Sequence, residues 1–474
     1  MRSVSEPVGR WRPLLYHLLA DAKTVFPGGE GHCTARATPD SRSQNCDTMR
    51  LAPERVDHEF HERGAMAAEA RGHDKPEDLA VAVELKFLLP LLIEGKADPD
   101  PADKRPLQIV GRDSQSDKKA CQKLAYDAIA ETIRNSGHDA TTSFVISTQN
   151  SAERAFWETH WIVKKANSAE PGPDEKKKSR GHYVWVGVEL SSPKLRACDN
   201  NTQTRLSEVF RALLERHRLV ANYTCDVHVH LGRFDGSPYT LSTLKRLGSF
   251  LWATEPTVRS IRNPLSPNYE NVYTWGAEMR RYSRLASAVS KSSQSSLDAE
   301  AVVDDGVKHV LSSREPNVFP QDQLALCLIW QAKTHCDLGQ LLSGPTKQYR
   351  RLGFNFGSFG LEDERSHISP RTVEFRIMEG TDRRDMILGW VAICCRIVEV
   401  AMKPSDHRYV AALRRLLCMY GGDKQEGEGA KDALGARRGR EFAALMKDLD
   451  LPRSVYGSFE EKVIRENIEW TPVE

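Results

Sequence analysis

Four short segments of this chain alternate apolar residues with carboxylates, histidines, lysine or arginine. They are residues 80–88 (AVAVELKFL), 183–190 (YVWVGVEL), 224–231 (TCDVHVHL) and 372–378 (TVEFRIM). Successive side chains of a strand point to opposite faces, so each segment predicts a strand with one apolar and one charged face. The pattern places these residues on the charged faces: Glu84, Lys86, Glu189, Asp226, His228, His230, Glu374 and Arg376. A sheet with such a face indicates a site that handles a polyanion.

The carboxylates of Glu84, Glu189 and Glu374 would crowd together if their strands were neighbours. Like charges at close range raise at least one pKa unless a cation neutralises them, and Mg²⁺ binds carboxylate and phosphate oxygens together. Arg376, two residues from Glu374, adds a fork of donors that suits phosphate. A metal-binding carboxylate beside such an arginine favours phosphoryl transfer. An ion pair on an exposed strand face is the commoner meaning of the E-x-R spacing and stays open.

Three interpretations are open for His228 and His230, which share a face of their strand. An H-x-H pair can hold a transition metal, but a zinc site needs a third and a fourth ligand. Asp226 lies roughly 13 Å from His230 along an extended strand, too far to complete a site with it. Contact with a nucleotide or substrate is therefore favoured over zinc, and a purely structural role is the remaining alternative.

The composition limits the classes of function. Hydrophobic residues make up 40% and charged residues 28% of the 474 residues, as in globular proteins with a sizeable core. The formal net charge is only +2, which argues against a dedicated nucleic-acid binder. Ten cysteines without a C-x-x-C pair favour a reducing compartment, so we expect a cytoplasmic protein. No apolar run approaches the roughly 18 residues of a membrane helix. Arginines near the N-terminus leave a transit peptide as the alternative.

The charged strands are expected in one domain, residues 78–405, between two less regular ends. Residues 1–77 lack a sustained period and predict a disordered extension, whereas residues 406–474 predict a short helical tail. Hydrophilic composition predicts mobile insertions at about 97–119, 167–181 and 283–306. Apolar spacing predicts helices at residues 123–135, 206–220, 241–253, 323–335 and 382–403. Asp382 is the expected N-cap of the last helix. The irregular alternation of elements predicts an α+β fold with a twisted, mainly antiparallel sheet flanked by helices.

The same segments, in this order, resemble motifs of the amidoligase family. That family belongs to the carboxylate–amine ligase superfamily, with glutamine synthetase and glutamate–cysteine ligase. The matching motifs are AVELKFLLP (82–90), VGVELSSP (186–193), DVHVHLG (226–232), NVY (271–273), FNF (354–356) and TVEFRIMEGT (372–381). The resemblance continues into the helix that contains Trp390 and covers about residues 78–405. It implies a glutamine-synthetase-like catalytic sheet that binds ATP and a divalent metal ion, Mg²⁺.

Carried over residue by residue, the resemblance implies three metal ligands, which are Glu84, Glu189 and Glu374. It implies that Arg376 contacts phosphate and that His228 or His230 lies near the nucleotide and the substrate. The implied reaction begins with phosphorylation of a small-molecule or peptide carboxylate by ATP. An amine then attacks the acyl phosphate and forms an amide, with release of ADP and phosphate.

Several residues depart from the family pattern. Lys86 replaces the second glutamate of G-x-E-x-E, Ala82 replaces its glycine, Ala166 replaces an aspartate and Met378 a histidine. One charge pair at about 4 Å is worth on the order of 4 kcal/mol at an effective dielectric of about 20. We therefore expect Lys86 to weaken one metal site or to pair with Glu84. The alternatives are a catalytically degenerate binding or scaffolding protein and, last, a zinc hydrolase that uses both histidines.

Overall fold

A computed structural model describes most of the chain after residue 73. The described residues are 74–146, 154–267, 269, 276–291, 307, 308, 310, 319–346, 351–360, 371–403, 407–419 and 430–466. The expected disordered extension falls outside this set except for residues 74–77. The NVY motif at 271–273 and most of the expected insertion at 283–306 also lie outside it.

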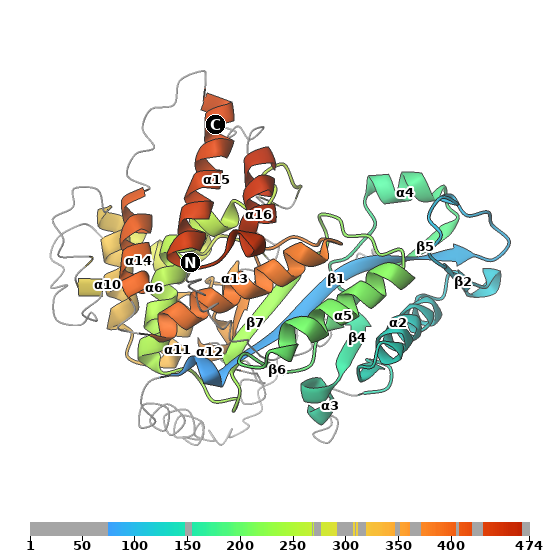
Figure 1. The fold of residues 1–474 in the computed structure, drawn as a ribbon, viewed down its shortest axis with the longest axis horizontal. Coiled ribbons are helices and arrows are strands. Elements are labelled where there is room, and N and C mark those ends of the chain that lie inside the picture. Colours follow the sequence, from blue (N-terminus) through green and yellow to red (C-terminus); the bar gives the residue numbers. More distant parts are fainter. Residues whose placement is uncertain are drawn as a thin grey trace, which may run out of the picture.

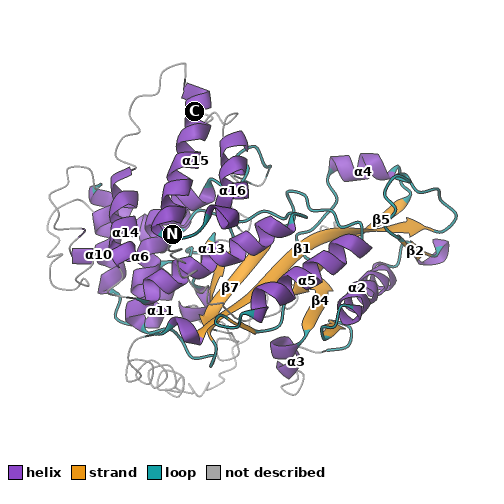
Figure 2. Ribbon diagram, viewed as in Figure 1, coloured by secondary structure: helices purple, strands orange, loops and turns teal. Residues whose placement is uncertain are grey.

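Nine described strands form one open sheet. The strands are β1 (Leu79–Ile93), β2 (Gln108–Val110), β3 (Ala140–Thr142), β4 (Trp161–Lys165), β5 (Tyr183–Ser191), β6 (Leu195–Arg196), β7 (Val227–Arg233), β8 (Phe354–Asn355) and β9 (Val373–Phe375). The order is β3-β4-β5-β1-β7-β9-β8, and β2 and β6 also pair with β1. All pairs are antiparallel except β1–β2 and β3–β4. The prediction of a mainly antiparallel sheet flanked by helices is confirmed (Figure 2).

The long strand β1 forms the centre of the sheet. Its residues are almost all buried, because β5 pairs with it on one side and β7 on the other. Pro90 is tolerated in the strand because the pairing with β7 ends at Leu85, so no β7 carbonyl requires an N–H at position 90. The four segments predicted as two-faced strands therefore become β1, β5, β7 and β9, with somewhat different ends.

Helices cover the apolar face of the sheet and extend beyond it. The described helices are α2 (Lys118–Asn135), α3 (Arg154–Thr159), α4 (Pro173–Ser179), α5 (Asn201–Arg216), α6 (Leu241–Arg259), α7 (Met279–Tyr282), α8 (Arg284–Lys291), α10 (Pro320–Gln331), α11 (His335–Leu341), α12 (Gly357–Gly360), α13 (Arg384–Met402), α14 (His407–Met419), α15 (Ala430–Asp448) and α16 (Arg453–Glu466). Figure 1 shows α2, α5 and α13 lying across one face of the sheet. The helices α6, α14 and α16 pack against α13, α15 packs against these three helices, and together they extend the core away from the strands.

One continuous core joins the sheet to these helices. It contains the odd-numbered residues of β1 from Val81 to Leu91, the valines of β7, and Phe375 of β9. Trp390 of α13 stacks edge-on against Phe375, with 6.4 Å between the ring centroids. Among the described residues, no helix is long and apolar enough to cross a membrane.

The three stretches expected as mobile insertions contain regular structure where they are described. Residues 97–119 include β2 and the start of α2, residues 167–181 include α4, and residues 283–306 include α8. In two of them, residues at the helix start favour a helix although the hydrophilic composition predicted a loop. Asp117 accepts hydrogen bonds from the backbone N–H groups of Lys119 and Ala120 at the start of α2. Pro173 begins α4, whose first turn is acidic and whose last turn is basic.

The expected N-cap of the long C-terminal helix is also corrected. The helix α13 begins at Arg384, and the capping position belongs to Arg383, whose side chain makes no capping bond. Asp382 is exposed and precedes the cap by one residue, so its carboxylate does not serve as the N-cap. A helix does begin in this region, but its capping position lies one residue later than predicted.

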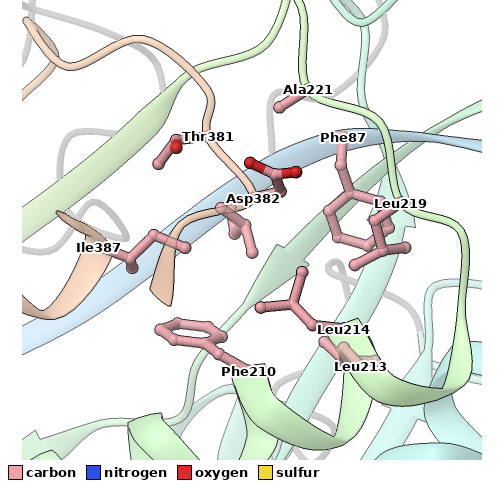
Figure 3. A pocket seen from close by; sticks show the side chains of 10 residues that line it. Phe87, Phe210, Leu213, Leu214, Leu219, Ala221, Thr381, Asp382 and Ile387 are labelled. Carbon is pink, nitrogen blue, oxygen red and sulfur yellow. The ribbon is translucent and has the colours of Figure 1, made fainter. Parts of the chain in front are cut away.

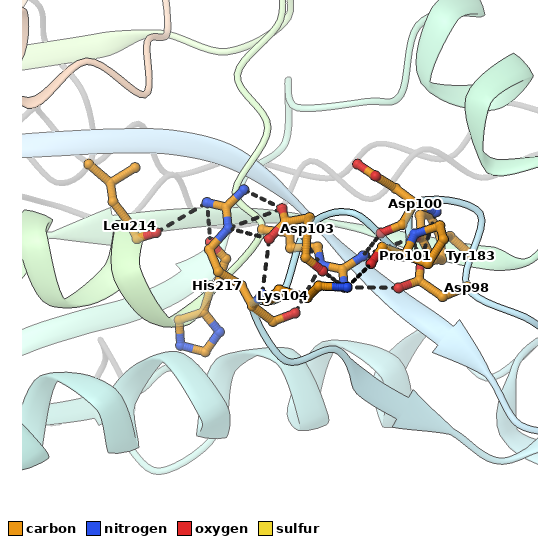
Figure 4. A network of polar contacts seen from close by, with 10 residues as sticks. Asp98, Asp100, Pro101, Asp103, Lys104, Tyr183, Leu214 and His217 are labelled. Carbon is orange, nitrogen blue, oxygen red and sulfur yellow. Dashed lines mark hydrogen bonds and ion pairs between the residues drawn. The ribbon is translucent and has the colours of Figure 1, made fainter.

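Two arginines fasten the loop after β1 to the C-terminal end of α5 (Figure 4). Arg105 donates to the carbonyls of Leu214 and His217, which the helix leaves without intrahelical partners. Arg218 donates to Asp98, 3.0 Å away, and to the carbonyls of the same loop. All guanidinium nitrogens of the two arginines donate to protein oxygens, so we interpret the network as a structural clip that sets the position of α5.

Candidate functional site

Cross-strand pairing gathers the predicted charged residues on the face opposite the apolar core. In the β1–β7 register Glu84 lies opposite His228, and in the β7–β9 register His230 lies opposite Glu374. Side chains at directly opposite positions point to the same face with Cβ atoms about 5 Å apart. All four side chains are buried. The sheet therefore brings together residues that are up to 290 positions apart in the sequence (84 to 374).

One group of side chains on this face has the composition of a metal centre. Ligand atoms of Glu84, His230 and Glu374 all lie within 4.8 Å of one another. His230 Nε2 is 3.5 Å from Glu374 Oε1 and 3.8 Å from Glu84 Oε2, and it has no hydrogen-bond partner among the described residues. A buried imidazole nitrogen left in this way between two carboxylates fits a metal ligand. Two carboxylates and one imidazole suit a divalent ion such as Mg²⁺ or Mn²⁺, with nitrogen favouring the transition metal.

Neighbouring side chains hold these donors in place. His228 Nδ1 donates to Glu84 Oε2 over 3.0 Å, because an ionised carboxylate can only accept. The side-chain amide of Asn355 on β8 donates to Glu374 Oε2 over 2.7 Å. Arg376 forms an ion pair with Glu374 Oε1. Partners of this kind fix the orientation of metal ligands.

Glu189, the third expected metal ligand, lies outside this group. It lies opposite Lys86 on β1 and opposite Lys164 on β4. Lys164 Nζ is 2.8 Å from Glu189 Oε1 and 3.2 Å from Glu84 Oε1. Its ammonium group therefore bridges the two carboxylates. Lys86 was expected to pair with Glu84. The strand register instead places Lys86 directly opposite Glu189.

A fourth buried carboxylate, Asp226, immediately precedes β7 and lies among cationic groups. Arg262, three residues after α6, places Nη1 3.8 Å from Asp226 Oδ1 and donates to the carbonyl of Ile377. The backbone N–H of Lys86 donates to the carbonyl of Asp226, which sets their side chains beside each other. Asp226 Oδ2 is 3.9 Å from His228 Nε2, at the edge of the metal group.

The protonation of the group follows from burial and from these neighbours. Burial disfavours the charge on Glu84, but Lys164 and the bond from His228 hold the pKa of Glu84 well below its usual range. Burial opposes the charge on Glu374 as well, and Arg376 outweighs it and lowers the pKa of Glu374. Burial, with the positive charges of Arg376 and Lys86, lowers the pKa of His228, which therefore stays neutral. Two carboxylates ionised at neutral pH are what a metal ion requires.

The pKa values of two carboxyls outside the metal group shift in the opposite direction. Burial and the negative charge of Glu84 raise the pKa of Glu189, although the lysines beside it act against the shift. Burial also raises the pKa of Asp226. The carboxylates that can reach a metal ion are therefore the more acidic ones on this face.

No protein-family model, no curated protein and no solved structure matches this chain.

Ala166 and Met378, which depart from the amidoligase motifs, lie in apolar clusters. Ala166, just after β4, is buried with Leu88, Ala169 and Cys225 in a small apolar cluster. Met378 belongs to the main core. Both residues therefore pack around the charged face and contribute no ligand.

Three residues of the face were not predicted, namely Lys164, Arg262 and Asn355. No two-residue pattern marks Lys164, because residues 161–165 (WIVKK) do not alternate: Ile162 shares the face of Lys164, and Lys165 shares the face of Val163. Arg262 follows a helix, and no local pattern indicates that its guanidinium reaches Asp226. Asn355 lies in a strand of two residues, too short to show a period.

An apolar pocket lies on the opposite side of the sheet from the metal group. It is lined by Leu85 and Phe87 of β1, by α5 and by the start of α13, as Figure 3 shows. Asp382 is the one acidic residue among those that line it. Because β1 separates this pocket from the charged side chains, it is not part of the candidate site.

Proposed function

We propose that this chain is an ATP- and divalent-metal-dependent carboxylate–amine ligase with a glutamine-synthetase-like catalytic sheet. The observation that carries the proposal is the position of the Arg376 guanidinium beside a buried group of two carboxylates and an imidazole. This arrangement puts phosphate-binding donors next to a potential metal ion, as phosphoryl transfer requires. The order of the amidoligase-like motifs along the chain is the second support.

Each residue has a stated role in the proposed reaction. Glu84, His230 and Glu374 would hold the metal ion, which when bound neutralises phosphate charge during transfer. Arg376 orients the transferring phosphoryl group with two parallel donors. His228 keeps the carboxylate of Glu84 in the position that a ligand needs.

The proposed reaction has two steps. A carboxylate oxygen of the substrate attacks the γ-phosphorus of ATP, and the bond from that phosphorus to the ADP oxygen breaks. The nitrogen of a neutral amine then attacks the acyl carbon, the bond to the phosphate oxygen breaks, and the nitrogen releases a proton. The products are an amide, ADP and inorganic phosphate. The substrate class is a small-molecule or peptide carboxylate with an amine donor.

The test is ADP formation from ATP with amino acids and short peptides as carboxylates and with ammonium or amino acids as amines. ADP should form only when metal, carboxylate and amine are all present. The Glu374→Ala, Arg376→Ala double variant should abolish it, whereas Arg383→Ala, which changes an exposed arginine, should leave it unchanged. ADP formation that survives in the double variant contradicts the proposal.

A second candidate function is a binding or scaffolding protein that retains this fold without catalysis. One observation favours it: the carboxylates of the face already have protein cations, with Lys164 between Glu84 and Glu189 and Arg376 on Glu374. Calorimetric titration with Mg–ATP separates the two candidates. Tight binding by the unchanged chain supports the ligase. Tight binding only after Lys86→Glu and Ala166→Asp supports the scaffold.

A further inference from the structure

The carboxylate of Glu84 stands between two positions that attract cations. Its Oε2 faces His230 and, with Glu374, completes the metal group. Its Oε1 faces Glu189 on the other side, at a place where two buried carboxylates would otherwise repel each other. A sheet with these three glutamates alone would invite a second divalent ion at the position between Glu84 and Glu189.

That second position contains the side chain of Lys164. Its Nζ lies 3.2 Å from Glu84 Oε1 and 2.8 Å from Glu189 Oε1. The ring of Trp157 lies 5.2 Å from the same nitrogen and offers it a π face. Lys164 is 8% exposed, so the ammonium group is enclosed by two carboxylates and an indole. Lys86 lies across from Glu189 on β1 and adds a second positive charge beside that carboxylate.

We propose that the Lys164 ammonium replaces a second divalent cation between Glu84 and Glu189, so that this site holds a single metal ion. The inference rests on the proposed metal group and concerns the number of ions that the group uses. A divalent ion at the second position would have to displace Lys164 and would meet the charge of Lys86. A tethered ammonium needs no free ion and keeps Glu84 ionised for the one metal ion that remains.

The proposal makes Glu189 a partner of Lys164 and excludes it from the metal ligands. Changes at Lys164 and at Glu189 should therefore have different effects on metal binding. Removing the ammonium opens the second position, whereas removing the Glu189 charge leaves the first position intact. The neighbouring Lys165 is exposed on the other side of β4 and provides a matched control.

The experiment counts Mn²⁺ ions per chain by electron paramagnetic resonance of free Mn²⁺ during titration of the full chain. The unchanged chain should bind one ion, and so should Lys164→Arg, Lys165→Gln and Glu189→Gln. Lys164→Gln should bind two. Circular dichroism during the titration checks that each variant is folded.

Each outcome decides a stated point. Two ions in the unchanged chain overturn the inference and leave the metal group standing. One ion in Lys164→Gln also overturns it, because the position would stay closed without the ammonium. Loss of the single ion in Glu189→Gln overturns it even if Lys164→Gln does not fold. No ion in the unchanged chain removes the metal group itself, and with it the proposed function.

Discussion

The two oxygens of Glu84 face two differently built halves of the charged face. On the lysine half, made of Lys164, Glu189 and Lys86, a protein ammonium group lies between the carboxylates. On the histidine half, made of His228, His230, Glu374 and Arg376, a buried imidazole nitrogen between two carboxylates has no hydrogen-bond partner among the described residues. In the lysine half the ammonium group lies between the two carboxylates, whereas in the histidine half Arg376 pairs with Glu374 and the position between Glu84, His230 and Glu374 could hold a metal ion. The same carboxylate can therefore have a structural partner at one oxygen and be available to a metal ion at the other.

Loss of the Lys164 ammonium group should lower the free energy of unfolding more than any other change proposed below. Lys164→Met leaves Glu84 and Glu189 buried without their shared cation, and breaking such a pair costs about 3–5 kcal/mol. Lys165→Met, on the exposed side of the same strand, should change stability by about 0.5 kcal/mol or less. Urea unfolding of both variants without metal measures the difference. Equal stabilities would mean that the bridge contributes nothing, and the contrast between the halves would fail.

Glu255 is a buried carboxyl outside the charged face, and its pKa can be compared with that of Glu84. Glu255 of α6 accepts hydrogen bonds from the backbone N–H groups of Met279 and Arg280, each over 2.7 Å. Burial raises the pKa of Glu255 to about 7, whereas the pKa of Glu84 is lowered beside Lys164. At Glu255 the effect of burial prevails, as it does at Glu189, whereas at Glu84 the charge of Lys164 and the hydrogen bond from His228 together outweigh burial.

The raised pKa of Glu255 has a defined consequence for stability. The folded protein binds this proton more tightly than the unfolded chain, so the stabilisation is complete below about pH 4.5 and is lost as the pH rises to about 7. The loss is on the order of 3 kcal/mol. In Glu255→Gln this decrease should be absent, as urea unfolding at several pH values will reveal. An identical pH dependence in both proteins would contradict the assigned cause.

Changes in the histidine half should act first on metal binding. Glu374→Gln removes a ligand charge and should weaken Mn²⁺ binding on the order of 100-fold, the upper end for changes around a metal site. Glu189→Gln is the matched change in the lysine half and should leave the Mn²⁺ affinity as it is. Isothermal titration calorimetry compares the two. A loss of affinity in Glu189→Gln equal to that in Glu374→Gln would erase the distinction between the halves.

The smallest effect concerns the residue that orients Glu84. His228→Ala removes the donor to Glu84 Oε2 and should weaken Mn²⁺ binding about 10-fold. His228→Asn can place an amide N–H near the same position and should recover part of the loss. If both variants bind Mn²⁺ as the unchanged chain does, His228 has no part in orienting the ligand.

The sequence predicted the faces of the strands better than their order. Alternation in β1, β5 and β7 indicated which residues share the charged face, because that period depends only on local backbone geometry. The register was not predictable, and it is the register that places His230 opposite Glu374 and Glu189 opposite Lys86. Glu189 was expected among the metal ligands, whereas His230 was expected to contact nucleotide or substrate, with a zinc site as the disfavoured alternative.

The same limit explains the errors outside the sheet. The hydrophilic composition of residues 167–181 predicted a mobile loop, but Pro173 and the charge order of the segment favour the helix α4. Asp382 was expected as an N-cap, and the helix begins one residue later than that cap requires. Composition describes a segment as a whole, whereas caps depend on single residues in exact positions.

We propose that Glu84, His230 and Glu374 together hold one divalent metal ion. Electron spin echo spectroscopy of bound Mn²⁺ tests it most directly, because the echo is modulated by a nitrogen that is a ligand of the metal. The account predicts modulation from one imidazole nitrogen, absent in His230→Gln and retained in His228→Asn. Bound Mn²⁺ without nitrogen modulation, or modulation that survives in His230→Gln, would contradict it.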